Sequence, residues 1–182
     1  KEQAVANNNI GVVYRRLDEN SIALDYHLKA LKLAEEIKEY YSVSVSLNSI
    51  GNIHIALGNY KDAISYFKRC LPIAEAANNN LGIAMNLNNI GEAYEQMNKT
   101  DSAIYYYNAS LKYNDKIHCD KGVAICYNSL GNVYQQQQRY EEAAQLYNKA
   151  LKINFQLGDI IYNAVNYNNL GFVYLHLKRY KE

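Results

Sequence analysis

The chain has 182 residues and a formal net charge of +1, and 49% of its residues are hydrophobic against 20% that are charged. This balance is that of a folded globular protein rather than a disordered chain, and the small net charge argues against nucleic acid or an acidic membrane surface as a partner. Polar residues interrupt the apolar runs every few positions, so none is long enough to cross a bilayer.

The chain begins at Lys1 without a charged and apolar leader, so we expect a processed or cropped start, with any signal peptide lying upstream. The cysteines are odd in number and lack CxxC spacing, which argues against a disulfide framework or a metal site, and no cofactor is expected. Free thiols fit a reducing compartment. The sequence therefore favours the cytoplasm, with the periplasm as the alternative if a signal peptide has been removed. The cysteines are Cys70, Cys119 and Cys126.

The most informative feature is an internal repeat with a period of forty residues. An aliphatic residue stands directly before a glycine in each unit, and an aromatic residue or a histidine follows three positions later, as in Ile90, Gly91 and Tyr94. Alanine stands twelve positions after each of the first four glycines. The five glycines that keep this period are Gly11, Gly51, Gly91, Gly131 and Gly171.

Each unit is predicted to form two helices separated by a turn. Apolar residues recur at steps of three and four, as in Leu87, Ile90 and Tyr94, which is the spacing of one helix face. Glycine and asparagine, as at Gly58 and Asn78, tolerate the left-handed backbone that ends a helix. The pattern predicts nine full helices. The first helix of each unit, the A helix, is expected near 2–17, 41–57, 80–97, 120–137 and 160–177, and the second, the B helix, in between.

Glycine and proline inside these helices have structural consequences. Glycine in a helix interior costs about 1 kcal/mol relative to alanine, so a repeated glycine needs a packing reason. We expect Gly91 to face Ala103 of the B helix at close range, with Tyr94 and Tyr107 filling the space beside them. Pro72 lies inside the second B helix, where it removes one backbone hydrogen bond, and a local kink is expected there.

These motifs resemble the tetratricopeptide repeat over nearly the whole chain. That family has an aliphatic-glycine pair, an aromatic residue three positions later, an alanine twelve positions after the glycine, and then an aromatic and a small residue, here Tyr107 and Ser110. The family's usual period is about 34 residues, and a proline usually ends its B helix. This chain has the longer period and Asp115 at that place, so its helices are expected to be longer.

The forty-residue spacing, with Ser49-Ile50-Gly51-Asn52, is similar to repeats of cell-polarity adaptors, kinesin light chains and bacterial sensor proteins. The resemblance implies an all-α fold, a right-handed superhelical solenoid of antiparallel helix pairs. It implies one domain over residues 1–182, with about four and a half repeats, as a fragment of a longer chain. It also implies a non-catalytic scaffold that binds an extended peptide, as the interaction or sensor module of a larger bacterial signalling protein.

The face of the A helices opposite the core carries the candidate peptide-binding residues. It holds an apolar row, a mixed row, and an asparagine three positions before every glycine. Because asparagine is a poor helix former, its recurrence indicates that each amide meets a partner. The candidates are Val45, Met85, Ile125 and Val165 of the apolar row, Asn52, Glu92 and Asn132 of the mixed row, and Asn8, Asn48, Asn88, Asn128 and Asn168 of the asparagine row.

Two interpretations of the asparagine row remain open from the sequence. The amides bind the backbone of a bound peptide or bridge neighbouring A helices, and both can hold at different positions of the row. The expected partner is a protein or peptide, including a segment of the parent protein, and neither nucleic acid nor a membrane. The family's clamp for a terminal carboxylate needs basic residues, and this chain has Asn8 and Asn48 in their place, so such a clamp is not expected.

The sequence offers little for catalysis, and we expect no enzyme. It contains no phosphate-binding loop, no H-E-x-x-H motif and no nucleophile elbow, and His27 and His54 replace aromatic packing residues of the repeat. The alternative to a peptide-binding scaffold is a structural spacer or an oligomerisation array. In the last A helix we expect Leu170, Val173 and Tyr174 to be exposed for lack of a covering B helix, and this open end to self-associate or fray.

Overall fold

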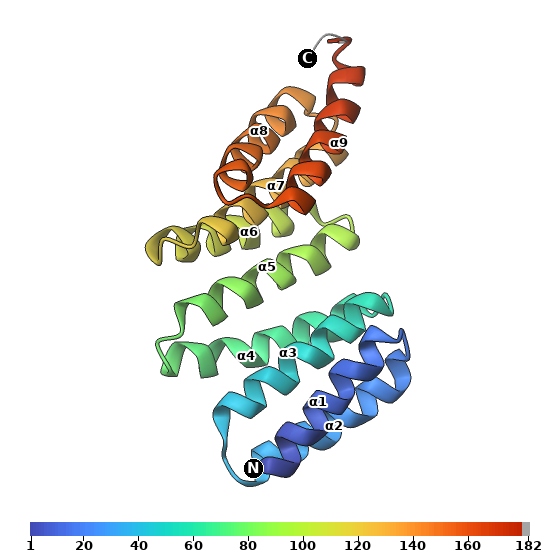
Figure 1. The fold of residues 1–182 in the computed structure, drawn as a ribbon, viewed down its shortest axis with the longest axis vertical. Helices are drawn as coiled ribbons and strands as arrows, with labels where there is room; N and C mark the ends of the chain where they lie inside the picture. The colour runs from blue at the N-terminus through green and yellow to red at the C-terminus, as the bar shows by residue number, and fades with distance from the viewer. Residues whose placement is uncertain (180–182) are drawn as a thin grey trace.

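The computed structural model describes residues 1–179, and the regular elements among them are nine helices. Each helix packs against the next along the chain, and α1 and α9 lie at opposite ends of an elongated array (Figure 1). The predicted all-α solenoid of antiparallel helix pairs is therefore confirmed. No helix in this part of the chain is long and apolar enough to span a membrane. The helices are α1 (Glu2–Arg16), α2 (Asn20–Glu36), α3 (Tyr40–Ala56), α4 (Tyr60–Ala76), α5 (Asn80–Gln96), α6 (Thr100–Lys116), α7 (Asp120–Gln136), α8 (Tyr140–Gln156) and α9 (Ile160–His176).

Every helix ends in the same left-handed turn, which sets the period of the array. After α3, the backbone N–H of Gly58 donates to the carbonyl of Ile55 at 3.0 Å. The N–H of Asn59 donates to the carbonyl of His54 at 2.8 Å. These two bonds satisfy carbonyls that a helix end leaves free. The residues with a left-handed φ recur every twenty positions, at Asp18, Lys38, Gly58, Asn78, Asn98, His118, Gln138, Gly158 and Lys178.

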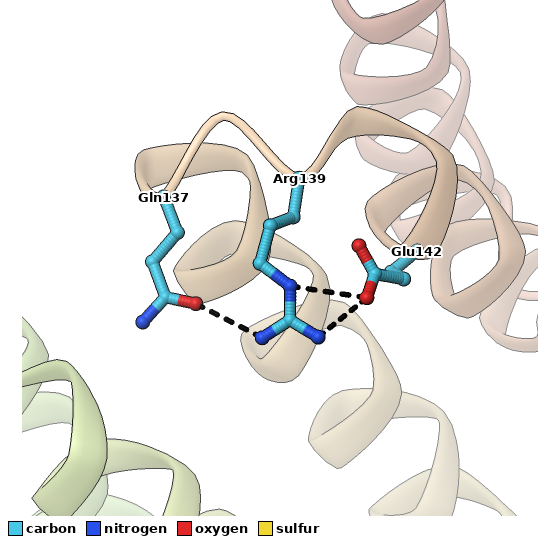
Figure 2. Close-up of polar contacts among 3 residues, drawn as sticks. All are labelled: Gln137, Arg139 and Glu142. Carbon is cyan, nitrogen blue, oxygen red and sulfur yellow. Dashed lines mark hydrogen bonds and ion pairs between the residues drawn. The ribbon is translucent and has the colours of Figure 1, made fainter.

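In the turn between α7 and α8, side-chain contacts surround a left-handed residue other than glycine. Gln138 has a φ of 60°. The next residue, Arg139, donates from Nε to Glu142 Oε1 at 3.0 Å, and Nη2 donates to the same oxygen. Its Nη1 donates to Gln137 Oε1 at 3.3 Å (Figure 2). The guanidinium group also lies 4.2 Å from the centre of the Tyr134 ring. These contacts tie the turn to both flanking helices.

The repeated glycine makes room for an aromatic ring. A Cβ built on Gly91 would lie 2.7 Å from ring carbons of the buried Tyr107, closer than Cβ atoms approach other groups. The expected packing of Tyr107 beside Gly91 is therefore confirmed, and the expected contact of Gly91 with Ala103 stays a prediction. Tyr94 stacks on Tyr106 instead, with ring centroids 5.4 Å apart. The same packing places His27 on Gly11, Phe67 on Gly51 and Tyr147 on Gly131.

Helix α4 continues without interruption through Pro72. The proline is exposed, and so is Lys68, whose carbonyl would otherwise accept a hydrogen bond from residue 72. Water can satisfy a carbonyl on the solvent side of a helix, which explains why the helix tolerates the loss. The kink expected at Pro72 stays a prediction.

The exposure of side chains on α9, the last A helix, differs from the sequence expectation. Leu170 and Val173 are buried against α8, and Tyr174 is half-buried. The expectation of exposure was wrong because these residues face the preceding repeat. The side of α9 that faces away from the array instead contains Gly171, which has nothing within 4 Å of a built Cβ. Beside it is a hollow of about 380 Å³. Large apolar residues exposed on α9 are Ile160, Ile161, Val165, Tyr167, Phe172 and Leu175.

Candidate functional site

The apolar row of the A helices is accessible to solvent along the whole array. Val5, which stands at the same place of the first repeat, is exposed by 43%, and Met85 and Val165 are exposed by 51% and 41%. Val45 and Ile125 are partly buried. Apolar side chains are thus accessible at the same place in five successive A helices, and exposed apolar surface that recurs in this way is typical of interaction sites.

Three hollows lie along this surface, one between each pair of neighbouring A helices from α1 to α7. Their volumes are about 210 Å³ between α1 and α3, 390 Å³ between α3 and α5, and 300 Å³ between α5 and α7. Each is lined by an asparagine of the row and by apolar residues of both helices, as Asn48, Val45 and Met85 line the middle one. The hollows repeat with the period of the sequence, and together with the surface around them we call them the groove.

Asparagine side chains bridge α3 and α5 across the groove. Asn48 donates from Nδ2 to Oδ1 of Asn86 at 3.3 Å, and its own Oδ1 accepts from Nδ2 of Asn52 at 3.1 Å. Asn52 in turn accepts from Nδ2 of Asn89, on α5, at 3.4 Å. The Asn48 and Asn52 amides therefore bond to neighbouring protein amides rather than lying free for a ligand.

A similar bridge joins α7 and α9. Asn128 donates from Nδ2 to Oδ1 of Asn166 at 2.7 Å. Asn169 donates to Oδ1 of Asn128 at 3.5 Å and of Asn132 at 3.4 Å. Asn132 also accepts the Tyr147 hydroxyl at 2.8 Å. Sequence reasoning missed the partners on the later helix, although a search for polar pairs about one repeat apart could have found them. Those partners are Asn86, Asn89, Asn166 and Asn169.

The other asparagines of the row make no such bridge. Asn8 Oδ1 lies 2.7 Å from Nδ1 of His27, within its own helix pair. Asn168 is exposed on α9. Asn88 lines the hollow between α5 and α7, and its buried Oδ1 has no hydrogen-bond partner. The five positions that look alike in sequence therefore have different environments.

Two carboxyl groups follow Asn88 on α5. Glu95 is buried; its Oε2 accepts the Tyr107 hydroxyl at 2.5 Å and its Oε1 accepts from Gln136 Nε2 at 3.4 Å. Burial raises the pKa of Glu95 above its usual range, against the opposite effect of the bond from Tyr107. Glu92 is partly buried, and burial raises its pKa too. Within residues 1–179, Glu92 makes neither a hydrogen bond nor an ion pair.

The buried thiols of the chain are poor nucleophiles. Cys126 donates from Sγ to Ser110 Oγ at 3.4 Å, and burial raises its pKa. Burial also raises the pKa of Cys70, to about 12. Because the thiolate is the reactive form, neither group is activated for covalent chemistry at neutral pH. In the described part of the chain, no group of three or more His, Cys, Asp or Glu residues could hold a metal ion.

Comparison with known sequences finds one family. The model of the tetratricopeptide repeat matches three overlapping stretches, residues 2–76, 42–116 and 82–154. These stretches together cover α1 to most of α8. The search of curated proteins finds no match to the chain.

Several solved structures have the same fold. The apo form of RapI has a TM-score of 0.87 at 22% identity, over 98% of this chain and 67% of that one. Aspartyl phosphate phosphatase F from Bacillus subtilis has a TM-score of 0.89 at 17% identity, over 98% of this chain and 48% of that one. A signal transduction ATPase with a tetratricopeptide repeat sensor, from Pyrococcus horikoshii, has a TM-score of 0.85 at 19% identity, over 94% of this chain and 27% of that one. The last two are at least twice as long as this chain.

Proposed function

Because the chain belongs to the tetratricopeptide repeat family, whose arrays serve as protein-interaction scaffolds with extended binding surfaces, we propose that its groove holds an extended polypeptide along the A helices. The chain acts without catalysis, as the interaction or sensor module of a larger bacterial signalling protein. Its partner is a protein or peptide, including a segment of that parent protein. The similar fold of a sensor in a signal transduction ATPase supports a role as the sensor module of a larger signalling protein.

The observation that carries the proposal is the series of hollows repeated along the groove. An extended chain presents its side chains at regular intervals, and a surface with regularly spaced apolar hollows is complementary to it. The hollows are near the lower end of the size range of ligand pockets, which suits single side chains better than a large cofactor. Met85 lines both the second and the third hollow, so the binding surface is continuous.

A structural spacer is the second candidate, and the asparagine bridges are the observation that favours it. Asn48 and Asn128 each bond to the next A helix, at 3.3 and 2.7 Å, and so stiffen the array without any ligand. A spacer requires no affinity for peptides. The two candidates therefore differ in whether the apolar row contributes to binding or only lies exposed.

Substitutions in the apolar row separate the two candidates. Met85→Glu and Ile125→Glu place a carboxylate at the edge of the hollows. We expect each to weaken peptide binding by about ten-fold, because a charge must be desolvated where an apolar side chain docks. Thermal stability should change little for Met85→Glu, since that side chain is 51% exposed. The measurement is fluorescence anisotropy with a library of short peptides of random sequence.

The matched control is Phe155→Glu, which changes an apolar residue on a B helix that is 74% exposed. It should leave peptide binding unchanged. If the two groove variants bind peptides as well as the unmodified chain does, the polypeptide lies elsewhere. If no peptide in the library binds the unmodified chain, the spacer is the better account.

A further inference from the structure

The asparagine bridges between A helices are interrupted between α5 and α7. In the α3–α5 bridge, Asn48 bonds to a residue 38 positions later, and Asn52 to one 37 positions later. The corresponding bonds of Asn128 and Asn132 have the same spacing. For Asn88 and Glu92 these positions hold Cys126 and Ser129 instead of asparagines, and no bridge forms.

The interruption leaves two acceptors without a donor on one face of α5. Asn88 Oδ1 is buried and unpartnered. The Glu92 carboxylate, one helical turn later on the same face, has no hydrogen bond or ion pair among the described residues. Buried acceptors in folded proteins are nearly always satisfied, so this pair favours a donor supplied from outside the chain.

The interval between α1 and α3 also lacks the asparagine bridge, but it has no such pair of acceptors. Asn8 Oδ1 already bonds to His27, at 2.7 Å. Val12 stands where Glu92 stands in the third repeat. Of the three intervals between α1 and α7, only the last has an unused acceptor at both of the positions from which the asparagine bridges start.

The hollow that Asn88 lines, one helical turn from Glu92, is mostly apolar. Leu81 and Met85 of α5 and Ile125 of α7 line it, and its volume of about 300 Å³ suits one apolar side chain. Lys121 also lines it, but the Lys121 ammonium pairs with Asp159 at 3.1 Å and so does not neutralise Glu92. The site therefore offers an apolar wall, a neutral acceptor and an unpaired negative charge.

We propose that the hollow between α5 and α7 determines the specificity of the groove, and that it selects an apolar residue next to a lysine or arginine. The apolar side chain occupies the hollow, a backbone N–H of the polypeptide donates to Asn88 Oδ1, and the cationic side chain pairs with Glu92. This inference rests on the proposed function, because it names the sequence that the groove prefers.

The test is a set of peptides capped at both ends, in which leucine is followed by lysine, arginine, glutamine or glutamate. Binding to the full 182-residue chain is measured by fluorescence anisotropy. The lysine and arginine peptides should bind roughly five- to ten-fold more tightly than the glutamine peptide, and the glutamate peptide should bind most weakly. In the Glu92→Gln variant, the lysine and arginine peptides should bind no more tightly than the glutamine peptide. The affinity for the glutamine peptide itself should not change. Glu36→Gln, an exposed position on α2, is the charge-matched control and should leave the preference intact.

A second variant introduces the asparagine bridge that is missing between α5 and α7. Cys126→Asn with Ser129→Asn introduces the residues found at the corresponding positions of α9, and should satisfy Asn88 from within the protein. Binding of all peptides should then weaken about ten-fold, with no fall in melting temperature. The inference is overturned if the unmodified chain shows no preference for the lysine and arginine peptides, or if Glu92→Gln leaves that preference intact. The proposed function stands in either case. Failure of every peptide to bind overturns both.

Discussion

A histidine in the first repeat takes the place that phenylalanine or tyrosine takes in the later ones. His27 is fully buried with its ring on Gly11, and its Nδ1 lies 2.7 Å from Asn8 Oδ1. Its other ring nitrogen, Nε2, is buried without a partner. Burial, assisted by the positive charge of Arg15, lowers the pKa of His27 from 6.5 to about 4. The folded protein therefore holds this imidazole neutral at pH 7.

We expect this histidine to make the fold sensitive to mild acid. The unfolded chain takes up the proton below pH 6.5, whereas the folded protein does so only near pH 4. The stability that is present above pH 6.5 is therefore lost as the pH falls between these values, by up to about 3 kcal/mol. His27→Phe, which reproduces the residue of the second repeat, should remove this part of the loss in thermal unfolding measured from about pH 7 to about pH 4.5.

His118→Asn is the control, because it removes an exposed histidine from a left-handed turn that asparagine tolerates. It should keep the acid sensitivity of the unmodified chain. Parallel loss of stability in His27→Phe and the unmodified chain would show that other groups cause the acid response.

The sequence predicts where each A helix begins and ends better than it predicts which residues of neighbouring helices touch. The A helices begin and end within about one residue of their predicted bounds, because the turn residues and the glycine repeat every forty positions. Ala103 and Tyr107 lie one turn apart on the same face of α6, and the Tyr107 ring is the group nearest to a Cβ built on Gly91. Spacing alone does not decide which of them meets the glycine, since that depends on the angle between two helices.

The glycines test this packing directly. Gly91→Ala should lower the free energy of unfolding by about 1–3 kcal/mol, since its Cβ would overlap the Tyr107 ring and the overlap outweighs the better helix propensity. Gly171→Ala has nothing within 4 Å to overlap and should raise it by up to about 1 kcal/mol. Urea denaturation measures both. Equal shifts in the two variants would contradict the role given to the ring.

At the scale of the whole molecule, the repeat does not predict the local differences between intervals of the array. Val45 and Asn48, which helical periodicity places near each other on one helix, line the same hollow, and peptide binding by their rows stays a prediction. The partners of each asparagine depend on residues one repeat away, where Asn86 and Asn166 alternate with Cys126. A pattern averaged over all repeats does not show which asparagines have a partner one repeat away. Self-association through the exposed apolar face of α9 stays a prediction.

The central claim is that a polypeptide lies along the A helices. The most direct measurement is nuclear magnetic resonance of the chain labelled at valine, isoleucine and methionine methyl groups, titrated with the tightest-binding library peptide. We predict shifts of the Val45, Met85 and Ile125 methyl signals, while those of Ile104 and Ile153 on the B helices stay unchanged. Shifts confined to the B helices or to the outer face of α9, with the groove signals unmoved, would contradict the account.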